Sequence, residues 1–475
     1  MFFNSLAFLL FFPLVVILYW ILPHKIRNYF LLLVSYYFYM NWNVSYGLLI
    51  LLSSIVTWVS ARLLKPKTEA SFSDLVNNKL ILWFCLLINL GILFLFKYAN
   101  FFIETVNMLF DSIRFGTKVP LLDILLPVGI SFYTFQAIGY TIDVYKGTVK
   151  AEKNFFTYAL FVSFFPQLVA GPIERAKHLL PQFNSKHFFD ADKAMQGITM
   201  MIWGYFMKIC IADHVALYVN AVYNNLDKHS GSSILLASFL FSLQIYGDFC
   251  GYSLIAIGAA KVMGFDLMEN FHLPYFSTNV KNFWKRWHIS LSSWFMDYVY
   301  IPLGGNRCSV WRHLLNLFIT FVISGMWHGA NWTFMIWGAY HGVLIMINTL
   351  WSKYGPKITH KGFLLHYLTI FSTFILVMFG WIFFRANTIS EAFYAIQKIF
   401  TNHEDLFIDK TTLTSSFISI LLLFIKEYIQ ESHPLYYNKI RKKKTGVIYI
   451  SMSLLVAFIL SFGYFFGDQF LYFQF

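Results

Sequence analysis

The sequence contains little charge. Only 12% of its 475 residues are Asp, Glu, Lys or Arg, whereas soluble domains average about 25%. Its four cysteines are scattered and form no CxxC pair, so neither a disulfide framework nor a cysteine metal site is expected. It also lacks a P-loop, a GxSxG motif and the spacing of zinc ligands. These absences argue against an ATPase, a soluble-type hydrolase and a metal site, and we expect no permanently bound cofactor.

The apolar content is correspondingly high. Hydrophobic residues make up 58% of the chain, aromatic residues 21%, and the mean hydropathy is +0.59. Several apolar runs reach the length at which a helix spans a bilayer, about 20 residues; they include 6–22, 80–96, 365–384 and 448–466. The first run has no basic lead-in and no small-residue cleavage site, so it is predicted to be an uncleaved span. The sequence therefore predicts an all-α, polytopic membrane protein.

The breaks between apolar runs predict how the chain is organised. Polar, proline and glycine interruptions divide it into about 11 to 13 candidate transmembrane helices. Stretches near 161–182 and 284–303 are predicted to be re-entrant, because irregular backbone at membrane depth must be buried in protein or line a cavity. No repeat or low-complexity tract is present. We therefore expect one membrane domain over residues 1–466, followed by an aromatic tail over 467–475.

The excess of basic residues bears on orientation. The formal net charge is +13, but the lysines and arginines fall in short loops between apolar runs. This is the positive-inside pattern of membrane proteins rather than the basic face of a nucleic-acid-binding protein. Clusters such as 62–67 and 439–444 are thus assigned to the cytoplasm, and the same count places the N-terminus and the tail outside. We expect contacts with membrane lipids and none with nucleic acid.

Two polar and aromatic stretches interrupt this apolar background. The first, NFWKRWHISLSSWFMDYVYIPLGGNR (282–307), has the pattern of a tryptophan-rich helix that contains Arg286, His288 and Asp297. The second, SGMWHGANW, places His328 within some of the most apolar sequence of the chain. A buried imidazole is either a core side chain satisfied by a carbonyl or a functional group, since ionisable residues within spans are costly and line pathways. The residues alone leave this choice open.

Neighbouring residues present similar alternatives. Gly325 and Gly329 flank His328 and leave room for a ligand or a second helix to approach the backbone. Asp248 lies in another apolar run. There the favoured interpretation is a polar clamp between helices through a hydroxyl or a backbone N–H, and catalysis is the alternative.

Several motifs in a fixed order carry a resemblance to a known family. The chain resembles the membrane-bound O-acyltransferase (MBOAT) family in RWHISLSSWFMDYVYIPLGGNR and GMWHGANWTFMIWGAYHG, which LPVGISFYTFQAIGYTIDVYKG, FFPQLVAGPIER and QIYGDFCGYSLIAIG precede. It is most similar to the bacterial branch that O-acetylates alginate and other exported polysaccharides. The motif core covers residues 120–345. The resemblance implies helices around a central tunnel, a location in the bacterial cell membrane and O-acetyltransferase activity.

The resemblance also implies which residues act. The family's essential histidine falls on His328 and its second, upstream histidine on His288, so both are candidate catalytic residues. The donor would be a cytoplasmic thioester, acetyl-CoA in the O-acetylating branch, and the acceptor would approach from the opposite face. Acyl transfer needs a base for the hydroxyl proton and a group that holds the developing oxyanion, and a neutral buried imidazole suits the first role. The residues assigned to the tunnel and its support are Trp327, Asn331, Arg286, Asp297 and Asp248.

The final stretch GDQFLYFQF is aromatic and has two interpretations. One is an interfacial anchor, because aromatic rings sit well at the headgroup level. The other rests on the resemblance, because envelope acylation systems with an MBOAT member carry a similar FxYFxF-like motif. Its tyrosine is proposed to receive the acyl group and pass it to an extracytoplasmic transferase. By that resemblance Tyr472 is the acyl relay, and an SGNH-type acyltransferase is the expected partner.

Three alternatives to polysaccharide O-acetylation stay open. The nearest is the D-alanyl branch of the same family, whose donor is a carrier-protein thioester and whose acceptor is teichoic acid. A transporter is the second, since broken helices and intramembrane polar groups are also its signature. A structural membrane component of an export complex is the third.

Overall fold

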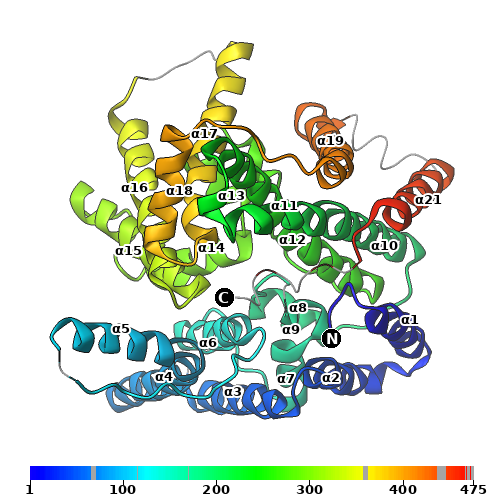
Figure 1. Ribbon diagram of the computed structural model, residues 1–475. Helices are drawn as coiled ribbons and strands as arrows, with labels where there is room; N and C mark the ends of the chain where they lie inside the picture. Colours follow the sequence, from blue (N-terminus) through cyan, green and yellow to red (C-terminus); the bar gives the residue numbers. More distant parts are fainter. Residues whose placement is uncertain are drawn as a thin grey trace. The chain divides into compact units, whose positions relative to one another are not determined.

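The structure is a computed structural model, and the part of the chain that it describes consists of helices and loops (Figure 1). The described residues are 1–65, 71–114, 116–169, 171–356, 362–435, 445–465, 467 and 471. No β-strand occurs among them. The all-α class that the sequence predicts is therefore confirmed.

The chain divides by its internal contacts into two compact units. The first comprises Met1–Gly197 with Ala256–Met268, and the second Ile198–Ile255 with Glu269–Phe475. Two helices, α10 (Ala191–Tyr205) and α12 (Gly231–Val262), contribute residues to both units.

The first unit is built around α6. Its helices are α1 (Leu6–Ile21), α2 (His24–Met40), α3 (Val44–Leu63), α4 (Phe72–Leu93), the π-helix η1 (Phe94–Tyr98), α5 (Ala99–Ser112), α6 (Ile130–Lys146), α7 (Phe155–Ser163), α8 (Phe165–Leu168) and α9 (Ala176–Phe183). Every side chain over 130–141 in α6 is buried, and α3 and α4 pack against this helix. The central position of α6 explains why its sequence is apolar or small over several consecutive turns.

The second unit contains the candidate site. Its helices are the π-helix η2 (Phe206–Ala212), α11 (Asp213–Tyr223), the 3₁₀-helices η3 (Leu226–Lys228) and η4 (Pro274–Phe276), α13 (Val280–Arg286), α14 (Ile289–Phe295), the π-helix η5 (Met296–Tyr300), α15 (Val310–His328), α16 (Trp332–Tyr354), α17 (Phe363–Arg385), α18 (Ile389–Thr401), α19 (Lys410–Ser432) and α21 (Thr445–Phe462). The helices α15 and α16 form an antiparallel hairpin, and α17 packs on α16 (Figure 1).

Two glycines allow the α15–α16 hairpin to close. A Cβ added to Gly325 would lie 2.3 Å from the Phe334 carbonyl oxygen, and one added to Gly338 would lie 2.5 Å from the Phe321 carbonyl oxygen. The two backbones are therefore in direct contact where each helix carries no side chain. The room that Gly325 leaves is taken by a second helix, one of the two occupants expected from the sequence.

Seven helical segments are long and apolar enough to cross a membrane, among the residues that the structure describes. They are Val44–Leu63, Phe72–Ser112, Ala191–Tyr223, Gly231–Val262, Trp332–Tyr354, Phe363–Arg385 and Lys410–Ser432. Two shorter apolar helices, Leu6–Ile21 and Gly446–Phe462, add to these. The larger number expected from the sequence also counted shorter or more polar segments, such as those that form α2, α6 and α15. The chain is a multi-pass membrane protein.

Candidate active site

The structure brings the two histidines singled out in the sequence to one place in the second unit. The ring centroids of His288 and His328 lie 6.4 Å apart, and the two residues are 1% and 3% exposed. The Trp327 ring contacts both, with centroid distances of 5.9 Å to His288 and 5.1 Å to His328. Two tryptophan–histidine dipeptides from distant parts of the chain thus form one buried group.

His328 is surrounded by aromatic rings. It is the last residue of α15, and Gly329 after it is extended. Trp337 of α16 and Phe384 of α17 present their rings nearly perpendicular to the imidazole, at centroid distances of 4.9 and 5.5 Å. Edge-to-face packing of this kind helps to hold a ring in one orientation.

The chain is broken at His288. The sequence predicts a helix-like stretch here with irregular backbone over 284–303, and the structure places a break within that range. The helix α13 ends at Arg286, α14 begins at Ile289, and His288 between them has a φ of 44°. This left-handed conformation is uncommon for a residue with a side chain. The neighbouring loop supplies the cause, because the Asn270 carbonyl accepts the Ile289 N–H at 2.9 Å and holds the turn.

Asn270 also fixes the His288 ring. Its Oδ1 accepts hydrogen bonds from the Ser290 hydroxyl at 2.9 Å and the Ser290 N–H at 3.4 Å, while its Nδ2 donates to Ser253 Oγ at 3.0 Å. These donors identify Oδ1 as the acceptor end of the amide. The His288 Nδ1 lies 3.1 Å from the same oxygen, so Nδ1 carries the hydrogen of this contact. In the neutral ring the lone pair is therefore on Nε2.

This geometry suits proton transfer at an oxygen. A buried neutral imidazole with a fixed tautomer presents a defined basic nitrogen, which is what removal of a hydroxyl proton requires. A second imidazole nearby can share that role or hold the reacting groups in line. The Asn270 side chain was not singled out in the sequence, although it determines which nitrogen of His288 is basic.

The other predicted residues take separate positions. Asn331 caps α16 by accepting the Thr333 N–H, and its Nδ2 donates to the Asn387 carbonyl at 2.9 Å. Arg286 makes two hydrogen bonds of 2.9 Å to Glu431 of α19. Asp297 itself is half-buried in η5.

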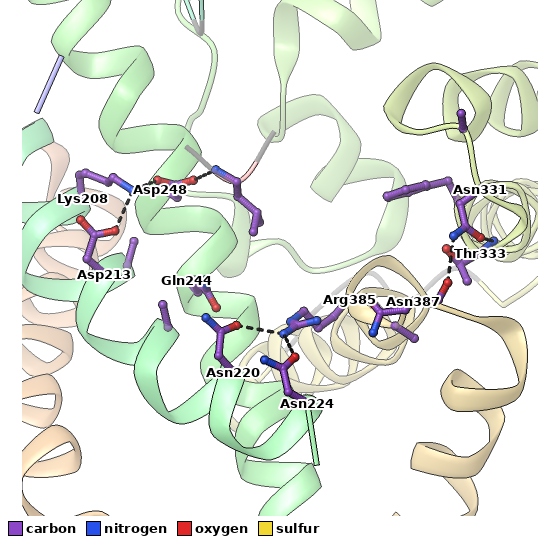
Figure 2. A pocket seen from close by; sticks show the side chains of 16 residues that line it. Lys208, Asp213, Asn220, Asn224, Gln244, Asp248, Asn331, Thr333, Arg385 and Asn387 are labelled. Carbon is purple, nitrogen blue, oxygen red and sulfur yellow. Dashed lines mark hydrogen bonds and ion pairs between the residues drawn. The ribbon is translucent and has the colours of Figure 1, made fainter. Parts of the chain in front are cut away.

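A cavity of about 520 Å³ lies in the second unit (Figure 2). At one side it meets Ala330 and Asn331, which follow the turn after His328. His328 itself is not among the described residues that line it. Elsewhere the wall includes Arg385, whose Nη2 donates to the Asn220 and Asn224 side-chain oxygens at 2.9 and 3.2 Å. The cavity thus approaches the histidine pair from the end of α15.

Asp248 makes polar contacts between separate segments, one of them with a backbone N–H as the sequence favoured, whereas its ion pair with a lysine was not expected. Its Oδ1 lies 2.7 Å from the Lys208 ammonium, and its Oδ2 accepts the Leu471 N–H at 2.6 Å. These contacts join α12 to a π-helix and to the C-terminal segment. Tyr472, the predicted relay, lies outside the described residues.

Comparisons with known proteins show what the chain as a whole is similar to. The model of the "MBOAT, membrane-bound O-acyltransferase family" matches residues 149–386. The probable alginate O-acetylase AlgI of Azotobacter vinelandii is 39% identical over 89% of this chain and 83% of its own length. The peptidoglycan O-acetyltransferase of Helicobacter pylori is 34% identical over 82% of this chain and 78% of its own length. The teichoic acid D-alanyltransferase of Bacillus subtilis is 30% identical over 48% of this chain and 60% of its own length.

Proposed function

The chain belongs to the membrane-bound O-acyltransferase family and is an acyltransferase, and we propose that it moves an acetyl group from cytoplasmic acetyl-CoA towards an exported cell-envelope polysaccharide. The observation that carries the proposal is the buried His288–His328 pair, because it supplies a nitrogen base inside a membrane protein. Relatives named for O-acetylation of alginate and of peptidoglycan match more than four-fifths of the chain. The polymer is thus of the envelope class.

The proposed chemistry is transfer of the acetyl group from sulfur to oxygen. The hydroxyl oxygen of the acceptor attacks the thioester carbonyl, a C–O bond forms, and the C–S bond breaks. His328 takes the hydroxyl proton, and the proton ends on the departing thiolate as the CoA thiol. His288, with Nδ1–H held by Asn270, keeps the reacting groups in place or shares the proton. No oxidation state changes in this transfer, so it needs no oxidant or reductant.

We extend the proposal to Tyr472 as the acceptor in a relay. Leu471, its chain neighbour, is 6% exposed and lies on the wall of the cavity beside the end of α15. An acetyl ester of a phenol keeps much of its transfer potential, so a covalent relay divides one long delivery into two shorter steps. From the tyrosine the acetyl group passes to the polymer by way of an extracytoplasmic SGNH-type acyltransferase. The protein would then lie in the bacterial cell membrane with its C-terminal segment outside.

A second candidate is D-alanyl transfer from a carrier protein to teichoic acid. The D-alanyltransferase of Bacillus subtilis favours it, because that protein is 30% identical to this chain over 48% of the chain's residues. The O-acetylating relatives match more of the chain and at higher identity, so acetyl transfer is preferred.

One experiment separates these readings. The purified protein is incubated with acetyl-CoA labelled in the acetyl group, and its C-terminal peptide is analysed by mass spectrometry. We expect one added acetyl group on Tyr472 in the wild type and none in Tyr472→Phe, which keeps the aromatic ring. Labelling by a D-alanyl carrier protein instead of acetyl-CoA would select the second candidate. Full polymer acetylation by Tyr472→Phe would rule out the relay but leave the acetyltransferase proposal standing.

A further inference from the structure

The second unit contains a buried ionic cluster that the proposed chemistry does not use. Lys208 of η2 lies 2.7 Å from both Asp213 Oδ1 and Asp248 Oδ1, and each of the three side chains is at most 5% exposed. One lysine side chain thus faces two carboxyl groups in the interior. Burying such groups in charged form is costly unless hydrogen-bond partners surround them.

The C-terminal segment meets both carboxylates of the cluster. The Leu471 N–H donates to Asp248 Oδ2 at 2.6 Å. Gly467 lies against the other carboxylate, because a Cβ added to it would be 2.3 Å from Asp213 Cγ. Before this point the segment runs along η2, where the Tyr464 N–H donates to the Ile209 carbonyl at 3.1 Å. The segment is thus held by backbone contacts at several successive places.

The cavity continues this pattern beyond Leu471. Gln244 Oε1 and Thr333 Oγ1 both line it, are buried, and have no hydrogen-bond partner among the residues that the structure describes. Buried oxygens of this kind are normally satisfied by N–H or O–H donors of protein or ordered water. An extended polypeptide supplies such donors at regular intervals, and the residue after Leu471 is about 3.8 Å away along the chain. The occupant that the cavity fits is therefore the peptide that follows Leu471.

We propose that Lys208, Asp213 and Asp248 form a backbone latch for the protein's own C-terminal segment, and that Gln244 and Thr333 continue this receptor across the cavity. Lys208 bridges the two carboxylates, and Asp248 binds the Leu471 N–H. Asp213 leaves no room for a side chain at position 467. The inference rests on the proposed function in one respect, since the segment it seats is the one that carries Tyr472. The docking itself requires no acyl transfer.

The test measures amide hydrogen–deuterium exchange of the C-terminal peptide in the purified, full-length protein in detergent. In the wild type the Leu471 amide should exchange at least tenfold more slowly than in a free peptide of the same sequence. Gly467→Ala introduces the clash with Asp213, and Asp248→Asn removes the charged acceptor. Both should abolish most of this protection. Gly446→Ala is the matched control, because nothing lies within 4 Å of the Cβ it adds in α21.

Each result decides between the two proposals. Fast exchange of Leu471 in the wild type, or equal protection in Gly467→Ala and Gly446→Ala, would overturn the latch whatever the enzyme transfers. Protection without acetylation of Tyr472 would support the latch and contradict the relay. Thr333→Val and Gln244→Leu should speed exchange beyond Leu471 by several-fold. If these two substitutions leave that exchange unchanged, and an added oligosaccharide instead slows the exchange of amides that line the cavity, the cavity binds a sugar. That result would overturn its assignment to the peptide.

Discussion

The two tryptophan–histidine dipeptides have the same sequence but different backbone conformations and surroundings. His288 precedes a helix, adopts a φ of 44° and is tied to Asn270. His328 ends a helix in regular conformation and is enclosed by Trp337 and Phe384. Hydrogen bonding fixes the tautomer of the first ring, whereas packing fixes the orientation of the second. The motif resemblance places the essential histidine at 328, so we propose proton transfer for His328 and positioning for His288.

The largest expected effect follows from that assignment. His328→Ala should lower acetyl transfer by about 100- to 10,000-fold, because general-base catalysis contributes that much. The rate is measured as formation of labelled product from acetyl-CoA at saturating donor. His313→Ala, at the other end of α15, is the control and should retain wild-type activity. A His328→Ala enzyme within threefold of wild type would remove His328 from the mechanism.

The second prediction keeps the His288 ring and changes only the group that fixes its tautomer. Asn270→Ala leaves the His288 Nδ1–H without its acceptor, and losing a buried hydrogen bond costs about 1–3 kcal/mol. If that loss is expressed in the transition state, the rate falls by about 10- to 100-fold. Asn270→Asp keeps the acceptor and adds a negative charge beside Nδ1–H. It should lose less activity and move the acid limb of the pH–rate profile to higher pH.

The control for this pair is Asn279→Asp, which exchanges the same residue types at the N-cap of α13 and preserves the cap. It should leave both the rate and the pH profile unchanged. If Asn270→Ala and Asn270→Asp lose activity equally and show the wild-type pH profile, Asn270 has only a structural role.

A smaller effect is expected from disturbing the packing around His328. A Cβ on Gly329 would lie 2.1 Å from the Phe334 ring, and that ring packs on Phe384 at a centroid distance of 4.8 Å. Gly329→Ala should therefore displace Phe384 from His328, at the cost of about 1–3 kcal/mol that overpacking brings. We expect a several-fold lower kcat with an unchanged KM. Gly362→Ala, which has open space around its Cβ, is the control, and equal kcat values would show that the aromatic packing does not orient His328.

The predictable part of the site is the part that local pattern determines. An apolar run with a capping serine and small residues at its contact face gives the α15–α16 hairpin, whose first helix is Val310–His328. The class of the fold follows from composition in the same way. The identity of the histidine pair, by contrast, came from motif resemblance, and the structure adds their proximity.

Irregular backbone was predicted over 284–303, but its position at His288 was not predictable, because the cause of this turn is not local. The residues on either side favour a continuous helix, and the turn exists only because Asn270, from a separate loop, binds the Ile289 N–H. The polar ENFH stretch at 269–272, which residues 263–268 separate from the end of the apolar helix α12, was the signal available for that loop. The same reason explains why Lys208 was missed: a single lysine in an apolar run acquires meaning only when two carboxylates from other turns reach it.

A third histidine, His178 in the first unit, is expected to make the stability of the fold depend on pH. The His178 Nδ1 lies 2.8 Å from Glu174 Oε2, and this hydrogen bond raises the pKa of His178 above its usual value. The unfolded chain releases this proton near pH 6.5. The contact therefore contributes its full stability below about pH 6.5 and loses it as the pH rises through the raised pKa of the folded protein.

We expect a small effect, because the His178 side chain is 43% exposed and an exposed ion pair contributes less than about 1 kcal/mol. His178→Gln should lower the melting temperature at pH 5.5 and not at pH 9, and added salt should reduce the difference at pH 5.5. His403→Gln, at an exposed position, should show no pH-dependent difference. A decrease of the same size at both pH values would mean that His178 stabilises the fold through packing and not through its contact with the Glu174 carboxylate.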